Sequence, residues 1–183
     1  MTLIQFADNT ALVNFALVGR IDVLARLMNG RGAWTATVRL ECEQSALFLE
    51  NDQLLTVGDF LGEPYYPETR DEFEAIQVAR EFLREPGDGP ERHLGEAETI
   101  AIVTSRGLAA LVVTDDTGAM RLAMRREIPV ATSSDLMILA VRANIIRPQE
   151  AWDCITALRV DHGRFLPRAP ETFADLLVLT GRL

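Results

Sequence analysis

A continuously apolar segment, residues 108–114 (LAALVVT), ends in two adjacent acids, Asp115 and Asp116. A run of this length without a polar face is typical of a strand that is buried on both faces of a parallel sheet. Parallel strands need long crossover connections, which are usually helices. The segment therefore predicts an α/β domain.

The rest of the chain repeats an order of short apolar segments and helical patterns. Apolar segments at residues 3–6, 33–37, 54–60 and 128–131 predict further strands. Apolar residues at helical spacing predict helices from residue 11 onward, interrupted near Gly19, and at 38–49, 68–84, 95–103, 118–126 and 134–144, with a clear break at 85–91 (EPGDGPE). This alternation predicts a three-layer α/β/α fold with a mostly parallel central sheet.

The predicted strands all fall within residues 1–148, which we expect to form one α/β domain. Residues 149–183 add a helix at 149–160 and a last amphipathic helix within 167–183. We expect this C-terminal extension to pack on the same domain, either as extra core helices or as a surface for a dimer or another partner.

The basic residues are all of one kind: there are 18 arginines and no lysine. A phosphate loop of the GxxxxGK[ST] type, a Schiff base and a receiver-type phosphoacceptor site all need a lysine ammonium group. Neither histidine accompanies a nucleophile signature, and Cys42 and Cys154 lack zinc-site spacing, so we expect the cysteines to be small buried hydrophobes. The composition excludes the lysine chemistries and argues against thiol or Ser-His-Asp catalysis.

The net charge of −9 is concentrated in one part of the chain. Residues 63–98 hold eleven acidic residues and four arginines, a net charge of −7, which leaves −2 elsewhere. This balance argues against coating of nucleic acid by bulk electrostatics but leaves room for local basic surface. No apolar run reaches the ~18 residues of a membrane span and the N-terminus lacks a basic leader, so we expect a cytoplasmic protein without a membrane segment.

Acidic residues follow the predicted strands at the points where the strands end. Asp8 follows the first strand, and Asp115 and Asp116 follow the strand at 108–114. Glu41 and Glu98 lie in the first turns of helices that should begin at the same edge of the sheet. Ligands of open α/β sheets bind at the carboxyl ends of the strands, so we expect acids from four segments to meet there.

The spacing of the acids in the sequence shows only in part which of them face the pocket. Glu96 and Glu98 are two residues apart on a helix, about 200° around its axis, so only one of them can face the pocket. We expect Glu98 to do so and Glu96 to have a supporting role. For Asp115 and Asp116 the alternatives stay open, because either acid can bind a metal while the other caps the next helix.

Each candidate also has a simpler interpretation. An isolated acid is more often a solvated surface group, and Asp8 is placed where it could serve as a helix N-cap. Thr10 and Thr114 are expected either to hydrogen-bond a carboxylate or a metal-bound water, or to cap the ends of elements. The joint placement of the acids favours a shared site.

Carboxylates a few ångströms apart repel one another unless a cation neutralises them. Oxygen ligands without clustered histidine or cysteine favour Mg²⁺ or Mn²⁺, and such ions promote phosphodiester hydrolysis. The expected catalytic residues are Asp8, Glu41, Glu98 and Asp116, and the expected metal ligands are these four together with Asp115.

Four short motifs resemble those of the PIN domain family, especially VapC-like toxins and their uncharacterised relatives. They are the opening strand with Asp8-Asn9-Thr10, then residues 37–41 (TVRLE), 94–101 (LGEAETIA) and 113–116 (VTDD) followed by Arg121. The resemblance spans about residues 2–148. It implies a three-layer α/β fold, Mg²⁺-dependent endoribonuclease activity, homodimers and inhibition by a small antitoxin protein.

We expect Arg121, Arg125 or Arg126 to contact the RNA backbone, although these residues fit a solvated helix face equally well. Two other functions remain open. A non-catalytic binding or regulatory module would keep the fold without strong metal binding, and a small-molecule phosphohydrolase would act on phosphate monoesters. The hypothesis that the sequence favours is a metal-dependent ribonuclease.

Overall fold

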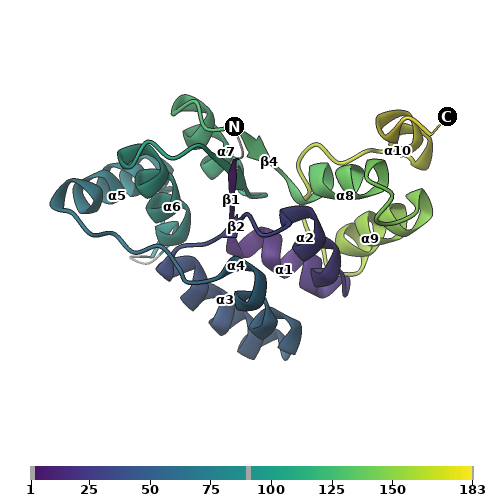
Figure 1. The fold of residues 1–183 in the computed structure, drawn as a ribbon, viewed down its shortest axis with the longest axis horizontal. Coiled ribbons are helices and arrows are strands. Elements are labelled where there is room, and N and C mark those ends of the chain that lie inside the picture. Colours follow the sequence, from purple (N-terminus) through teal and green to yellow (C-terminus); the bar gives the residue numbers. More distant parts are fainter. Residues whose placement is uncertain (1–2, 90–91, 183) are drawn as a thin grey trace.

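The computed structural model describes residues 3–89 and 92–182 (Figure 1). Within them, four strands form one parallel sheet in the order β2-β1-β3-β4. The strands are β1 (Ile4–Ala7), β2 (Gly32–Ala33), β3 (Ala110–Val113) and β4 (Val130–Ala131). Helices cover both faces of this sheet, so the expected three-layer α/β/α fold is confirmed.

Each face of the sheet has its own apolar core, because alternate residues of a strand point to opposite faces. Phe6 and Val112 pack under α5 (Arg70–Leu83), α6 (Leu94–Ser105) and α7 (Thr117–Arg125). Ala7 and Val113 pack under α1 (Asn9–Leu17), α2 (Ile21–Met28) and α8 (Ser133–Arg142). These two groups of helices lie to the left and right of the strands in Figure 1.

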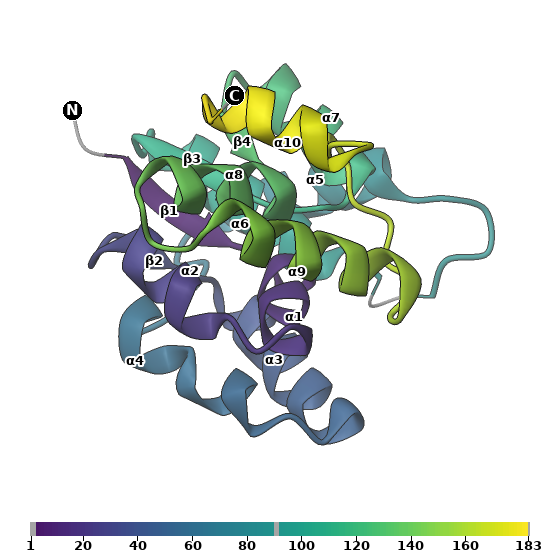
Figure 2. The ribbon, with the colours of Figure 1, turned by 90° about the vertical axis from the view of Figure 1, so that its right-hand side faces the viewer.

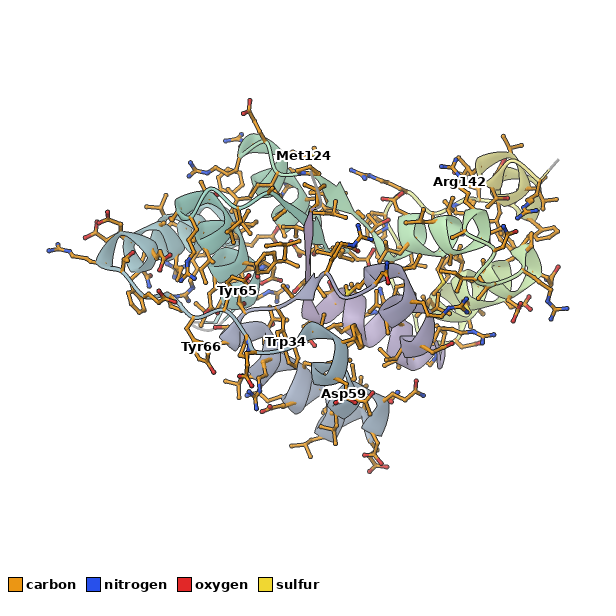
Figure 3. All side chains as sticks on the ribbon, viewed as in Figure 1. Trp34, Asp59, Tyr65, Tyr66, Met124 and Arg142 are labelled. Carbon is orange, nitrogen blue, oxygen red and sulfur yellow. The ribbon has the colours of Figure 1, made fainter. Side chains whose placement is uncertain are left out.

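The carboxyl end of β1 points toward α3 (Ala36–Leu49), which lies below the sheet in Figure 1 and packs on both α1 and α6. The strand predicted at 33–37 is shorter than expected, because Thr35 already takes the N-cap position of α3. Trp34 between them donates from Nε1 to the Gly62 carbonyl at 2.8 Å and lies beside α4 (Gly58–Leu61) in Figure 3. Helix α3 therefore closes the end of the sheet at which the acids were expected.

The predicted strand at 54–60 is wrong. These residues form a 3₁₀ turn, η1 (Asp52–Thr56), followed by α4. Leu54, Val57 and Leu61 are the buried residues of the segment, and their spacing of three and four is helical rather than alternating. The helices predicted up to residue 160 are all confirmed, and each begins and ends within two residues of the predicted position. Residues 90 and 91 of the expected break lie outside the described residues.

The C-terminal extension forms α9 (Pro148–Val160) and α10 (Phe173–Thr180), which pack on α8 and on each other (Figure 2). Ile155 and Leu176 belong to the same apolar cluster as α1 and α2. Arg142 of α8, labelled in Figure 3, donates to the Leu179 carbonyl of α10. The extension thus shares one core with the sheet. No described helix combines the length and the apolar character needed to cross a membrane.

Candidate metal centre

Asp8 follows β1 directly and is almost fully buried. Its backbone N–H donates to the Val113 carbonyl at 2.9 Å, which continues the pairing of β1 with β3. Asp8 takes the N-cap position of α1, but its side chain makes no capping hydrogen bond. Instead, the hydroxyls of Thr10 and Thr114 donate to its Oδ2 at 2.6 and 2.8 Å. The carboxylate is therefore oriented by two hydroxyls rather than used as a cap.

The same two threonines join the segments that follow β1 and β3. The Asp115 backbone N–H donates to Thr10 Oγ1 at 3.4 Å, and the Asp116 backbone N–H donates to Thr114 Oγ1 at 3.1 Å. Each hydroxyl thus links Asp8 to the backbone of the Asp115-Asp116 pair. This network fixes the distance between the acids that were predicted to converge.

Asp115 and Asp116 have different surroundings, which sequence spacing left open. Asp115 Oδ1 accepts from the Ser133 backbone, and its Oδ2 accepts from the Asn14 amide at 2.8 Å and from the Ser133 hydroxyl. Asp116 caps α7 by accepting from the Ala119 backbone at 2.6 Å and also lies beside Glu96. Protein donors occupy both oxygens of Asp115, so Asp116 is the better metal ligand of the pair.

Glu96 and Glu98 also differ, and here the structure departs from the expected choice of Glu98. A carboxylate oxygen of Glu96 lies within 4.8 Å of a ligand atom of Asp116. Glu98 is buried, and its Oε2 accepts from the Thr37 backbone at 3.0 Å, in the first turn of α3. The packing of α6 against α3 turns Glu98 toward the unpaired N–H groups at that helix end, which carboxylates stabilise. Glu96 therefore replaces Glu98 as the acid of α6 that faces Asp116.

Glu41 reaches the site from α3 and contacts the beginning of α6. The Gly95 backbone hydrogen-bonds to its carboxylate. A Cβ atom on Gly95 would lie 2.7 Å from Glu41 Oε2 and 3.0 Å from Val38 Cγ2, so the Glu41 carboxylate would have to move to make room for it. The GEAE motif thus begins with glycine because the Glu41 carboxylate occupies the space next to it.

The carboxyls of Asp8, Glu41, Glu96 and Asp116 form what we call the acidic cup. Burial and the charges of Asp8 and Glu98 raise the pKa of Glu41 to about 7. Burial and the charges of Asp8, Glu41 and Asp116 raise the pKa of Glu96 to about 9. Burial also raises the pKa of Asp8, against the opposing effect of the two threonine hydroxyls. The negative charges of the cup thus oppose one another's ionisation, as expected for carboxyls held close together.

His93 was not predicted to belong to the site. It has a left-handed backbone conformation (φ 61°) at the N-cap of α6. Ligand atoms of His93, Glu96 and Asp116 all lie within 4.8 Å of one another, and His93 Nε2 also lies 3.3 Å from Asp88 Oδ2. His93 precedes Glu96 by three residues in the sequence, but its orientation toward the cup depends on its left-handed backbone conformation.

The three arginines expected to contact RNA have different surroundings. Arg121 and Arg125 belong to α7, and Arg126 directly follows it. Arg121 Nη2 would lie 3.9 Å from a Cβ on Gly118, near the Asp116 carboxylate. The Arg125 guanidinium stacks 4.7 Å above the Phe82 ring. Arg126 borders a pocket with Leu3 and Ala110, at the amino end of the strands. Only Arg121 is therefore next to the acidic cup.

Replacing Glu98 with Ala is expected to lower the free energy of unfolding by about 1–3 kcal/mol, because the Thr37 N–H would lose its partner in a partly buried position. Urea unfolding followed by circular dichroism measures this change. Glu43→Ala on α3, the helix whose N-terminus Glu98 contacts, is the control. Its exposed ion pair with Arg39 should be worth less than about 1 kcal/mol. Equal losses in the two variants would remove the capping role of Glu98.

The fold and this site define an α/β protein with a carboxylate-rich cup at the carboxyl ends of parallel strands. Comparison with protein-family models, with curated proteins and with solved structures gave no match. The function is therefore argued from the geometry of the cup.

Proposed function

We propose that this protein is a Mg²⁺- or Mn²⁺-dependent endoribonuclease of the PIN-like class. The observation that supports this proposal is the meeting of Asp8, Glu41, Glu96 and Asp116, which come from four separate segments, at one end of the sheet. Carboxylates with such raised pKa values destabilise one another in the absence of a cation. A site of this kind is more easily explained by metal binding than by packing.

The donor set fits a hard divalent ion. Carboxylate oxygens dominate it, and the His93 imidazole adds one nitrogen that Mn²⁺ accepts more readily than Mg²⁺ does. We assign Asp8, Glu41, Glu96 and Asp116 as ligands and His93 as an additional one. An ion held there would supply Lewis-acid activation of a phosphodiester and of water.

Residues around the cup would prepare the site for this ion. Thr10 and Thr114 hold Asp8 in one orientation through their hydroxyls. At neutral pH the raised pKa keeps Glu96 protonated in the absence of metal, so metal binding would release a proton. Arg121, next to Asp116, is the arginine best placed to contact a phosphate of the RNA.

The resemblance to VapC-like toxins extends the proposal to a homodimer that a small antitoxin inhibits. A cytoplasmic location would agree with an RNA substrate. The alternative function is a catalytically inactive binding or regulatory module, which would keep the fold and bind metal weakly. Metal affinity separates the two, because only the nuclease needs an occupied cup.

Calorimetric titration of the metal-free protein with Mn²⁺ at neutral pH is expected to give a binding isotherm, accompanied by proton release. Asp116→Asn should weaken binding by at least about 10-fold, because it removes a charged ligand. Asparagine is as good an N-cap as aspartate, so α7 should remain intact.

Asp161→Asn, an exposed position after α9, serves as the matched control and should bind like the wild type. The absence of heat at millimolar Mn²⁺, in a protein with native circular dichroism, would favour the non-catalytic module. Cleavage of several single-stranded RNAs with Mn²⁺ completes the test of the nuclease.

A further inference from the structure

A second cavity opens beside the acidic cup. It has a volume of about 550 Å³ and is lined by residues of α1, α3 and the loop that connects α9 to α10. Thr10 and Glu41 border this cavity as well as the cup. We call it the α1–α3 pocket. A ligand in this pocket would be a direct neighbour of a group held in the cup.

The wall of the α1–α3 pocket combines an apolar surface with hydrogen-bonding groups. Val13, Leu17 and Leu49 contribute aliphatic side chains, and Phe48 contributes an aromatic ring that is 87 % exposed. Ser45 adds a hydroxyl, which accepts from the Asn9 amide at 3.1 Å. An exposed aromatic side chain next to polar groups is the usual surface for stacking and reading an unpaired base.

Arg164, from the C-terminal extension, is held at the edge of this pocket. Its Nε donates to Asn14 Oδ1 at 2.8 Å, and the Asn14 amide donates in turn to Asp115 Oδ2 at 2.8 Å. Among the described residues, no hydrogen bond uses its two terminal nitrogens. The guanidinium is therefore fixed in place through Asp115 and can still donate to a ligand in the pocket.

We propose that the α1–α3 pocket binds the nucleobase of the nucleotide next to the scissile phosphate in single-stranded RNA, with Phe48 stacking on the base and Arg164 donating to the base or its phosphate. The proposal rests on the proposed ribonuclease function and specifies its substrate class. The shared Glu41 is the central observation, because a phosphodiester in the cup places the attached nucleoside directly beside it.

The size of the pocket agrees with this ligand. Its volume of about 550 Å³ falls within the range of about 300–1,000 Å³ that is common for small-ligand sites. A base stacked in an RNA duplex could not enter it, whereas an unpaired base can turn out of the strand. The basic group at its edge offsets the negative charge of the neighbouring cup, which would otherwise repel a phosphate.

The test measures binding by full-length protein of fluorescein-labelled single-stranded RNA hexanucleotides, by fluorescence anisotropy with millimolar Ca²⁺ in place of Mg²⁺. A set of probes carries one abasic residue at each position in turn. For the wild type, one abasic position should weaken binding about 10-fold, as expected for the loss of one stacked base. Phe48→Ala should weaken binding of the intact RNA to a similar degree and abolish the abasic effect at that position.

Leu47→Ala is the matched control, because Leu47 is the preceding residue of α3, is 78 % exposed and does not line the pocket. It should bind RNA within about two-fold of the wild type. Phe48→Trp should retain its affinity for RNA, and the fluorescence of the introduced indole should be quenched when unlabelled RNA binds. The Phe48→Ala effect is then one of lost stacking rather than of altered folding.

Three other outcomes would overturn the proposal. If Phe48→Ala and Leu47→Ala bind alike while the wild type binds and cleaves RNA, the pocket is not a base site although the nuclease function holds. If Phe48→Ala keeps the full abasic effect, the base lies elsewhere. If the wild type binds no single-stranded RNA and cleaves none with Mn²⁺, both the subsite and the proposed function fail.

Discussion

Replacing Asp8 with Asn is expected to lower the rate of RNA cleavage by about 10³-fold or more, the largest catalytic effect of any single change in the cup. Asp8 carries the only charge that follows β1 directly, and its carboxylate is already oriented by Thr10 and Thr114. Asparagine keeps an oxygen that accepts from both hydroxyls but loses the negative charge that a divalent ion needs. The fold should therefore survive while metal-dependent cleavage does not.

The measurement compares initial rates on one single-stranded RNA at saturating Mn²⁺. Asp153→Asn is the control, since Asp153 is exposed on α9, away from the cup, and accepts from Gln149 at 2.8 Å, a bond that asparagine can also make. Control and wild type should cleave alike. Cleavage by Asp8→Asn at the wild-type rate, with unchanged metal dependence, would remove the cup from the mechanism.

The second large effect concerns stability and pH. The pKa of Glu41 is raised to about 7 and that of Glu96 to about 9, whereas both groups ionise near 4.5 in an unfolded chain. Between pH 4.5 and the raised pKa of each group, the unfolded state has released a proton that the folded state still retains. Raising the pH from 5 to 9 is therefore expected to destabilise the metal-free protein progressively.

Glu96→Gln should relieve much of this destabilisation. At pH 9 the metal-free variant is expected to be more stable than the wild type by about 2 kcal/mol, or about 4–8 °C in Tm, while near pH 4.5 the two should be similar. Added Mn²⁺ should raise the Tm of the wild type at high pH and that of the variant much less. Differential scanning calorimetry measures all three differences.

Glu72 should make the opposite contribution to the pH dependence of stability. Arg106 and nearby backbone groups lower the pKa of Glu72 to about 2, so its stabilising contribution is lost only in acid, below the window of the cup. Glu171→Gln, at an exposed position, should leave the pH profile unchanged. A wild-type Tm that rises from pH 5 to pH 9, or a Glu96→Gln profile parallel to it, would contradict the repulsion described for the cup.

The sequence was sufficient to predict the central part of the fold. Residues 108–114 and 3–6 are apolar runs that end in acids, and both form the adjacent strands of the sheet. The carboxyl ends of adjacent parallel strands meet necessarily, so Asp8 and the Asp115-Asp116 pair could be placed together without coordinates. The segment at 54–60 was misassigned because so short an apolar run fits either period.

The choice of individual acids needed the tertiary structure. Glu96 faces Asp116 whereas Glu98 accepts from the first turn of α3, and the direction of each depends on how α6 packs against α3. Asp115 was indistinguishable from Asp116 until Ser133 and Asn14, both distant in the sequence, appeared as its donors. His93 depends on a left-handed backbone turn, which a non-glycine residue rarely adopts and which spacing does not predict.

The strands at the two margins of the sheet, β2 and β4, pair through only two residues each. A margin this short offers few free N–H and C=O groups to a strand from another molecule. Among the described residues, the sheet therefore offers little edge for a strand of a second copy to pair with. If copies associate through the part of the chain that the structure describes, side chains on the outer helices are the expected contacts, and surface substitutions there should change the association.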